Sequence, residues 1–488
     1  MKPSAWSVTS LDGARAPFGT ALASSGADVP ALSDLTVDLD GARYVEEEFL
    51  LSGAAGTWET GDPGAPRRRE SGIPYRTRVL VRRPSSLRDA TGVTHVEPLH
   101  PHRDAGLTWD ALAPHLIRRG DAWVGVTVFP DVARLMRDQL DPDRYGRLLV
   151  PGLGTEWDVL SDALAAVREN ALGALETRRI VLSGWSATGS VCRVFAQEGF
   201  ATARGGLVDG VAIVISSGGA GPAGYPPLTP DAATVDLADP RRTVRDVGVP
   251  VFEILSETES ETHRAQLRDD SDDPADTYRL YQLAGAAHIE DWPGRHATNA
   301  RTLAAAGHAD TGVPMREALT DARSDLVVRA LFDRLVDAID GRPAPRAARF
   351  SYETGDVPEE RMLRRDADGN VLGGIRTPWI EAALAAYAPH GTPAAKGSGP
   401  DWTPMADAGF AARLTGTMTP LAPAEVRRRF PSAEAYREAF TAATDALLAE
   451  RMLLADDAGE LIESAPGRWE TAADESDASL VPSPEAGV

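Results

Sequence analysis

The chain alternates, up to about residue 345, between short apolar runs and longer amphipathic stretches. The runs are rich in Val and Ile, and several are bounded by Gly or Pro, a pattern that predicts β-strands. Amphipathic stretches such as 109–119 and 156–175 repeat their apolar residues every three or four positions, which predicts helices. The expected strands cover residues 35–51, 76–82, 93–97, 122–129, 179–183, 210–216, 249–255 and 277–283.

This alternation of strands with helices predicts an α/β fold. Helices that connect parallel strands form right-handed crossovers and cover the faces of the sheet. We therefore expect a mostly parallel eight-stranded sheet flanked by helices, with antiparallel pairing among the first strands. The later strands are apolar at successive positions, so both of their faces should be buried.

Composition divides the chain into a core and its flanking segments. Residues 1–34 are rich in Ala, Ser, Gly and Pro without periodicity and predict an irregular arm, whereas 35–345 hold the strand series and predict the core. Within the core, the Pro- and Gly-rich segment 217–247 predicts an insertion that serves either as a lid or as a plain surface excursion. Residues 346–470 predict a helical and irregular C-terminal extension packed on the core, without a second strand series. The acidic segment 471–488 predicts a disordered tail.

Composition and charge narrow the class of protein. Hydrophobic residues make up 43% and charged residues 25% of the 488 residues, as is typical of a soluble protein with a large core. With 72 acidic against 50 basic residues, the net charge of -22 disfavours nucleic acid and anionic lipid as partners. The single Cys192 cannot form an internal disulfide, Met1–Ser10 shows no apolar leader, and no apolar run approaches about 18 residues. We therefore expect a cytoplasmic protein without a membrane or nucleic-acid partner, and the sequence leaves monomer and homo-oligomer open.

The sharpest local motif is the segment 179–195, in which a strand pattern passes into a helix pattern at Ser186. A serine at such a turn is presented above the sheet, at a helix N-terminus that favours negative charge. The turn requires small neighbours, and Gly184 supplies one. The second glycine, expected two residues after the serine, is replaced by Thr188, and Gly189 follows. The motif predicts a nucleophilic serine, and a plain turn with a helix N-cap is the alternative interpretation.

A serine hydroxyl needs an adjacent base, and the base needs an acid to orient it. The seventh expected strand is followed by Glu257 and Glu259, and the eighth is followed, after a small-residue loop, by His288. The order serine, acid, histidine is that of the α/β-hydrolase fold. We therefore predict Ser186 as the nucleophile and His288 as its general base, with Glu259 narrowly favoured over Glu257 as the acid.

Two backbone N–H groups should stabilise the oxyanion that forms when the serine attacks a carbonyl group. One belongs to Ala187, directly after the serine, and the other should come from the loop after the third expected strand. The first residues of that loop that carry an N–H, Leu99 and His100, are the candidates. Trp185, beside the serine, either lines the acyl pocket or packs beneath the turn.

Several segments match a known family. They are Pro74–Pro84, Val96–Pro98, Ala122–Thr127, Arg144–Tyr145, the Gly-Trp-Ser-Ala-Thr-Gly turn, Ser256–Glu259, Ala284–His288, Asp368–Arg376 and Thr415–Pro420. On these segments the chain resembles the bacterial family of α/β-hydrolase domain-containing proteins, from about Tyr44 to Glu463. The family also carries its second glycine one step late, so Thr188 does not count against Ser186.

The resemblance implies the α/β-hydrolase fold and a catalytic triad. In the family the acid loop usually runs Thr-Glu-Thr-Asp, so Glu259 takes the place of the Asp and Glu257 matches the Glu. The acid therefore stays open between these two positions.

Together these features predict a serine hydrolase that cleaves a carboxylic ester or lactone of a small or medium-sized organic substrate through an acyl-enzyme. An acyltransferase or lactone-processing enzyme with the same triad, and a catalytically silent binding protein on the same scaffold, are the alternatives. No cofactor is expected. No metal site is expected either, because His100 and His102 are separated by a proline and lack nearby carboxylate or Cys partners. The segment Asp366–Asn370 resembles the start of a calcium loop but has Thr377 where the twelfth, acidic ligand belongs.

Overall fold

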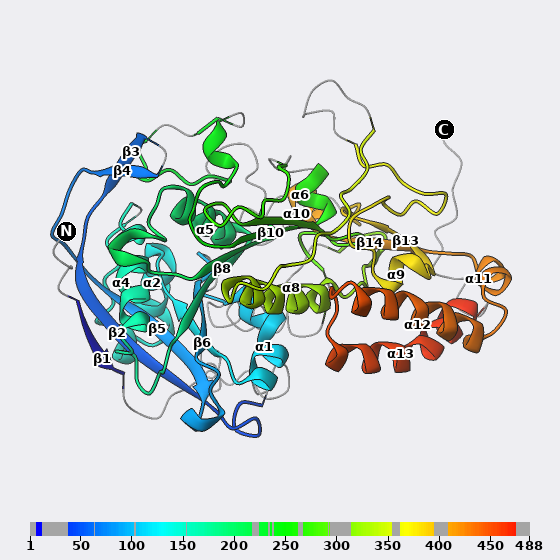
Figure 1. The fold of residues 1–488 in the computed structure, drawn as a ribbon, viewed down its shortest axis with the longest axis horizontal. Helices are drawn as coiled ribbons and strands as arrows, with labels where there is room; N and C mark the ends of the chain where they lie inside the picture. The colour runs from blue at the N-terminus through cyan, green and yellow to red at the C-terminus, as the bar shows by residue number, and fades with distance from the viewer. Residues whose placement is uncertain are drawn as a thin grey trace.

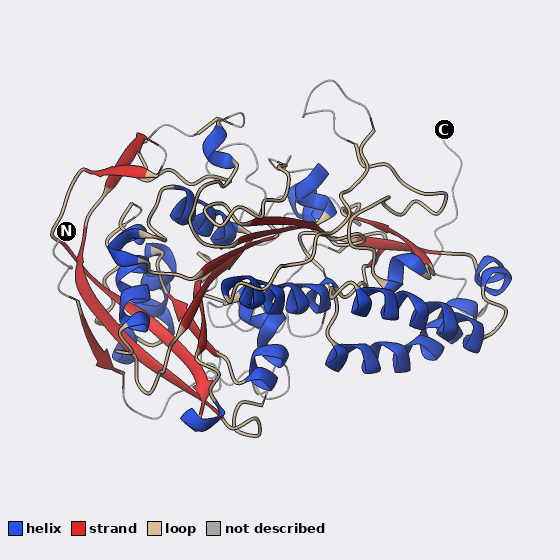
Figure 2. Cartoon of the chain, viewed as in Figure 1, coloured by secondary structure: helices blue, strands red, loops and turns tan. Residues whose placement is uncertain are grey.

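The computed structural model describes residues 6–11, 38–62, 64–101, 104–152, 154–216, 224–232, 235–236, 239–261, 267–290, 292, 314–353, 362–394 and 408–474. A twisted central sheet runs through the molecule, with helices on both of its faces (Figure 1). The last part of the chain adds a mainly helical region at one end, next to a smaller group of strands (Figure 2).

The main sheet has, within the described residues, nine strands in the order β1-β2-β5-β7-β6-β8-β9-β10-β11. The first three pairings are antiparallel, and all pairings from β7 to β11 are parallel. The carboxyl ends of these parallel strands therefore lie at one edge of the sheet. The strands are β1 (Ser7–Ser10), β2 (Tyr44–Ala55), β5 (Ile73–Pro84), β6 (Val93–Pro98), β7 (Ala122–Val126), β8 (Arg179–Trp185), β9 (Gly210–Val214), β10 (Val251–Leu255) and β11 (Tyr278–Gln282).

All eight expected strands are present, and the mostly parallel sheet flanked by helices is confirmed. The ninth strand, β1, lies where an irregular arm was expected, because its sequence Ser-Val-Thr-Ser holds one apolar residue and shows no strand pattern. Of the rest of the expected arm, the structure describes Trp6 and Leu11. Residues 1–5 and 12–34 of the arm, and residues 475–488 of the expected tail, lie outside the described residues.

Helices pack on both faces of the sheet. In the described part of the chain, α1 (Leu107–Arg119) and α8 (Ser324–Ile339) contact one face, and α4 (Glu156–Arg168) and α5 (Ala187–Gln197) contact the other. Each helix buries one apolar stripe against the strands. The first core includes Leu112, Leu116, Val328 and Leu331, and the second includes Leu160, Leu164, Val191 and Val194. No helix in the described ranges is both long enough and apolar enough to cross a membrane.

A buried carboxylate fixes the connection from β6 into α1. The first turn of α1 has no side-chain cap of its own. Glu97, in β6, accepts the N–H groups of Thr108 (2.8 Å) and Trp109 (3.2 Å) and the indole N–H of Trp123 (3.1 Å). Burial raises the pKa of Glu97 to about 7 despite these three bonds. The start of α1 is thereby fixed to the end of β6, at the carboxyl edge of the sheet.

The C-terminal extension contains strands that the sequence pattern did not predict. β13 (Ala385–Ala388) and β14 (Thr417–Pro420) pair antiparallel, and β14 also pairs with β12 (Ala318–Leu319). The expectation of no second strand series in 346–470 is therefore wrong, because strands of four residues are too short for an alternating pattern to stand out.

The described helices of the extension are α9 (Pro378–Glu381), α10 (Ala408–Leu414), α11 (Pro423–Arg429), α12 (Ala433–Ala449) and α13 (Ala455–Ala473). Other short elements are β3 (Trp58–Asp62), β4 (Ala65–Arg68), α2 (Pro130–Leu135), α3 (Pro142–Tyr145) and α6 (Glu257–Glu261).

The extension shares an apolar core with the sheet. Trp379, Tyr436 and Phe440 are buried in the same cluster as the inner faces of α1 and α8. The ring of Phe440 lies 5.6 Å from that of Trp379 and 5.7 Å from that of Tyr436, measured between centroids. Contacts of this kind bury large apolar areas, so the extension and the core stabilise one another.

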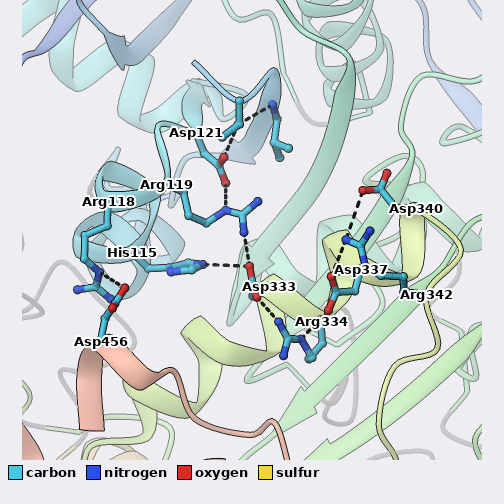
Figure 3. A network of polar contacts seen from close by, with 12 residues as sticks. His115, Arg118, Arg119, Asp121, Asp333, Arg334, Asp337, Asp340, Arg342 and Asp456 are labelled. Carbon is cyan, nitrogen blue, oxygen red and sulfur yellow. Dashed lines mark hydrogen bonds and ion pairs between the residues drawn. The ribbon is translucent and has the colours of Figure 1, made fainter. Parts of the chain in front are cut away.

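Ion pairs join the same surfaces. Asp457 of α13 accepts hydrogen bonds from Arg118 of α1 (2.8 Å) and Arg329 of α8 (3.4 Å). Arg118 also lies 3.5 Å from Asp456, beside a wider network of polar contacts among residues on and directly after α1 and α8 (Figure 3). Asp457 is buried, so its two partners compensate a charge that water does not reach.

The described part of the expected insertion 217–247 packs against the face that carries α4 and α5. Tyr225 and Leu228 are buried there; the tyrosine hydroxyl donates to Glu198 (2.8 Å), and Trp157 donates to the carbonyl of Leu228 (3.1 Å). Residues 217–223, 233–234 and 237–238 lie outside the described residues, and a lid formed by them stays a prediction.

Candidate active site

The chain turns sharply at Ser186, between β8 and α5. Ser186 has φ 58° and ψ -122°, a conformation that non-glycine residues rarely adopt. Its N–H donates to the carbonyl of Val214 in β9 (3.0 Å), and its own carbonyl accepts the N–H of Ser190 (3.1 Å). These two bonds hold the strained turn at the carboxyl edge of the sheet, where the serine is partly exposed. This is the geometry expected of a nucleophile elbow.

Two glycines allow this turn to form. A Cβ atom at Gly184 would lie 2.3 Å from the carbonyl oxygen of Thr188, and one at Gly189 would lie 2.7 Å from the Cβ of Ser216. Thr188, where a glycine was first expected, closes the turn instead. Its hydroxyl accepts the N–H of Trp185 (3.0 Å) and lies 3.0 Å from the carbonyl of the same residue. The late second glycine is thus required by the packing against Ser216.

The structure brings Ser186, His288 and Glu259 together. The Oγ of Ser186 lies 2.8 Å from Nε2 of His288, and Nδ1 of His288 lies 2.6 Å from Oε1 of Glu259. A carboxylate can only accept, so Nδ1 carries the proton and Nε2 is left to accept the hydroxyl proton of the serine. The three side chains follow β8, β11 and β10, whose carboxyl ends share one edge of the sheet.

Both oxygens of Glu259 are occupied. Oε1 contacts the imidazole, while Oε2 accepts the backbone N–H of Ser256 (3.2 Å) and also the Ser256 hydroxyl. The side chain of Glu259 is 0% exposed and that of His288 is 12% exposed. A carboxylate that is fixed in this way also fixes the plane and tautomer of the ring that it contacts.

Glu257, the other predicted acid, contacts the backbone of the loop that carries His288, and not the histidine ring. Its Oε1 accepts the N–H of Gly285 (2.7 Å), and its Oε2 pairs with Arg365 of the extension (2.9 Å). Burial raises the pKa of Glu257 to about 7, against the opposing effect of Arg365. Of the two glutamates that the sequence left open, Glu259 is the one in contact with the histidine ring.

The three backbone N–H groups predicted as oxyanion donors differ in whether they already bond to protein acceptors. The N–H of Leu99 donates to Val126 (2.9 Å) and that of His100 donates to Ala105 (3.0 Å), so both are used within the fold. Leu99 thus continues the pairing of β6 with β7, and the N–H of His100 closes a turn before α1; a second oxyanion donor from this loop stays a prediction. Ala187 begins α5, and within the described residues its N–H has no protein acceptor.

A buried ion cluster that sequence reasoning missed holds the same loop. Asp104 has φ 46°, and its carboxylate accepts hydrogen bonds from Arg78 (3.0 Å) and the hydroxyl of Thr127 (3.0 Å). Arg78 also pairs with Glu48 (2.5 Å), and these charged side chains are at most 1% exposed. Burial raises the pKa of Asp104 to about 6, although Arg78 opposes the shift. The sequence signal for this cluster was the presence of two charged residues, Glu48 and Arg78, inside expected strands.

Two further residues that sequence reasoning missed order the acid loop. The hydroxyl of Thr258 accepts the backbone N–H of His288 (3.1 Å), and the hydroxyl of Ser256 accepts the N–H of Thr258 (3.1 Å). Both belong to the matched Ser-Glu-Thr-Glu segment. Short polar side chains in a loop are usually solvated, so their type alone did not single them out.

Trp185, directly before Ser186, is buried. It is 1% exposed, and its ring lies 6.2 Å from that of Trp292, edge to face. This placement favours the packing interpretation, and contact with an acyl group stays a prediction.

No group of three or more His, Cys, Asp or Glu side chains that could hold a metal ion occurs in the part of the chain that the structure describes. The carboxylates of the Asp366–Asn370 turn are already paired, Asp366 with Arg376 (3.1 Å) and Asp368 with Arg429 (2.5 Å). His102 lies outside the described residues.

Comparison with known proteins gives one match that spans most of the chain. A family model described as "Alpha/beta hydrolase domain" matches residues 14–463. No curated protein matches the sequence.

Among solved structures, the chain is similar to an esterase from Pseudomonas putida, with 14% identity, a TM-score of 0.29, and coverage of 50% of this chain and 74% of that one. It is similar to a dienelactone hydrolase from Anabaena variabilis, with 19% identity, a TM-score of 0.27, and coverage of 47% and 89%. It is also similar to a carboxylesterase from Lactobacillus plantarum, with 17% identity, a TM-score of 0.26, and coverage of 38% and 68%.

The steric role of Gly184 predicts a large effect of the substitution Gly184→Ala. The added methyl group would meet the backbone of Thr188, so we expect the free energy of unfolding to fall by at least about 2 kcal/mol. Gly459→Ala is the matched control, because a Cβ there meets nothing within 4 Å on the exposed side of α13. It should leave stability unchanged or raise it by up to about 1 kcal/mol. Urea unfolding measures both, and equal stability of the two variants would contradict the steric account.

Proposed function

The chain belongs to the alpha/beta hydrolase domain family, and we propose that it is a serine hydrolase that cleaves carboxylic esters or lactones of small or medium-sized organic substrates. The observation that carries the proposal is the chain of contacts from the Ser186 hydroxyl through His288 to Glu259, at 2.8 and 2.6 Å. Such a chain supplies a nucleophile, a base within hydrogen-bonding reach of it, and an acid that orients the base.

In the first half of the reaction, Ser186 Oγ attacks the carbonyl carbon of the ester while His288 Nε2 takes the hydroxyl proton. An O–C bond forms, and the carbonyl electron pair moves onto the oxygen to give a tetrahedral oxyanion. When this intermediate collapses, the bond to the alcohol oxygen breaks. The alcohol leaves with the proton from His288, and the acyl group remains on Ser186.

In the second half, water repeats these steps. His288 takes a proton from the water molecule as its oxygen attacks the acyl carbon, and collapse of the new intermediate breaks the bond to Ser186. The serine recovers its proton from His288 and the carboxylic acid leaves. Proton and charge balance over the two halves, so the reaction requires no cofactor.

Two features of the site support these roles electrostatically. The N–H of Ala187 lies at the N-terminus of α5, where the helix dipole favours the negative charge of the oxyanion. Glu259 lies against Nδ1, where it stabilises the imidazolium that forms each time His288 takes a proton.

The nature of the substrate follows from charge and from the chemistry of the site. The net charge of -22 disfavours polyanions, nucleic acid and anionic lipid, so we infer a small-molecule ester. A cytoplasmic location belongs to the same proposal.

We expect Ser186→Ala to lower the turnover of p-nitrophenyl acetate by at least about 1,000-fold, because the nucleophile itself is lost. Ser464→Ala is the control, since that serine bonds only to a carbonyl of its own helix α13 in the described structure. It should keep wild-type turnover. Release of p-nitrophenol measures both variants, and wild-type turnover by purified Ser186→Ala protein would end the assignment.

Glu259→Gln should lower kcat by about 100- to 10,000-fold, because a neutral amide no longer fixes the imidazole tautomer or stabilises the imidazolium. Glu434→Gln, at the start of α12, removes an exposed carboxylate and should keep kcat within about threefold of wild type. Steady-state kinetics on both variants test the assignment. An unchanged kcat in Glu259→Gln would show that this carboxylate is not the acid of the triad.

A further inference from the structure

The loop that carries the histidine, residues 283–289 and here called the histidine loop, is bonded to the C-terminal extension where it begins. The N–H of Ala284 donates to the carbonyl of Ile375 (3.0 Å), and the N–H of Ile375 donates to the carbonyl of Gln282 (2.7 Å). Ile375 therefore continues the hydrogen bonding of the sheet beyond the end of β11, in the manner of a parallel strand.

The extension is also bonded to the histidine loop where the loop ends. The N–H of Ile289 donates to the carbonyl of Leu414 (2.8 Å), and the carbonyl of Ile289 accepts the N–H of Gly416 (2.8 Å). A Cβ atom at Gly416 would lie 2.6 Å from the Cβ of Ala287. The extension thus touches the residues directly before and after His288.

Glu257 joins the middle of the histidine loop to the extension. One carboxylate oxygen accepts the N–H of Gly285 and the other pairs with Arg365, at 2.7 and 2.9 Å. The backbone N–H of Glu257 also donates to the carbonyl of Ala286 (3.1 Å). The Glu257 side chain is 1% exposed and that of Arg365 is 27% exposed, so the charge of the carboxylate depends on this one arginine more than on water.

Thr258 makes a parallel connection. Its hydroxyl accepts the backbone N–H of His288 (3.1 Å) and donates to the carbonyl of Pro389 in the extension (3.0 Å). Three consecutive residues of α6 therefore contact the histidine loop. Glu259 contacts the ring itself, while Glu257 and Thr258 connect the backbone of the loop to the extension.

We propose that Glu257 is a positioning residue for His288, and that through Arg365 it makes the C-terminal extension part of the apparatus that holds the base in place. The inference rests on the proposed function, since it concerns the base assigned there. Glu257 touches neither the serine nor the imidazole. It acts through the backbone of the histidine loop.

The physical reason is the sensitivity of proton transfer to distance. A buried carboxylate that loses its counter-charge either takes up a proton or moves toward water, and both changes weaken its bond to the N–H of Gly285. Gly285 has φ +77°, and a Cβ there would lie 2.5 Å from Ile380, so this turn has little room to relax within the extension. A shift of about 1 Å at a catalytic group lowers turnover about 100-fold.

The test uses the full chain and p-nitrophenyl acetate as substrate. We expect Glu257→Ala to lower kcat by about 10- to 100-fold, with KM within about threefold of wild type, because the substrate site is intact and the base is displaced. Arg365→Met should have a similar but smaller effect, and Arg365→Lys should recover most of the loss because it restores the positive charge. The double variant Glu257→Ala/Arg365→Met should be no slower than Glu257→Ala alone, since the two residues act as one unit.

Asp457→Asn is the matched control for the docking of the extension. It removes a buried carboxylate that also joins the extension to the core, through Arg118 and Arg329 of α1 and α8 and not through the histidine loop. It should lower the melting temperature and leave kcat unchanged. If Glu257→Ala does not fold, Glu257→Gln replaces it, because the amide keeps an acceptor for the N–H of Gly285 and loses the charge; it should then show an intermediate loss of kcat.

The outcomes separate this inference from the proposed function. Wild-type kcat in folded Glu257→Ala protein, or an equal loss of kcat in Asp457→Asn, would overturn the positioning role and leave the serine assignment standing. Failure of Arg365→Lys to recover activity lost in Arg365→Met would overturn the role of the arginine charge. Activity in wild-type protein that persists in Ser186→Ala would instead overturn the proposed function, and the positioning role with it.

Discussion

The candidate site depends on a carboxylate that is removed from water. Glu259 has no exposed surface, so each of its oxygens must be met by donors within the protein, and Ser256 and the His288 ring supply them. The need to satisfy the buried carboxylate fixes the orientation of the His288 ring. Nε2 of that ring then lies 2.8 Å from Oγ of Ser186, whose backbone is held in a strained conformation. The parallel sheet makes the meeting of these distant segments possible, because β8, β10 and β11 lie in the same parallel half of the sheet, with β9 between β8 and β10, and bring their following loops to one edge.

Buried ion pairs hold the loops around Ser186, His288 and Glu259. Asp104, bonded to Arg78, fixes the loop after β6, and Glu257, bonded to Arg365, fixes the histidine loop. Such pairs contribute little net stability, because the cost of removing two charges from water offsets most of their attraction. Their value here is geometric, since a charge that cannot move to solvent holds its partners in one arrangement. The extension supplies Arg365 to one of these pairs and shares an apolar core with the sheet, so it belongs to the same structural unit as the three site residues.

Sequence patterns predicted the parts of this arrangement that repeat or that have local requirements. The later strands were visible because buried parallel strands are continuously apolar, and Ser186 was visible because a strand-to-helix turn between glycines has a distinctive local sequence. The choice between Glu257 and Glu259 was not visible, since the two lie on one short helical turn and differ in which distant atoms they meet. The bonds that the N–H groups of Leu99 and His100 make, to Val126 and to Ala105, were not visible either, because such contacts have no sequence pattern of their own. The contact of Arg365 with the acid loop spans 108 positions, and no local pattern can show it.

The central claim, that the serine at the turn is made nucleophilic by the imidazole beside it, is tested most directly by a fluorophosphonate probe, which reacts with activated serines. The adduct is mapped to its peptide by mass spectrometry, in the wild-type protein and in His288→Ala. The account predicts a single adduct on Ser186 that forms at least about 100-fold more slowly in the variant. An unmodified Ser186 in folded wild-type protein, or equal labelling rates with and without the imidazole, would contradict it.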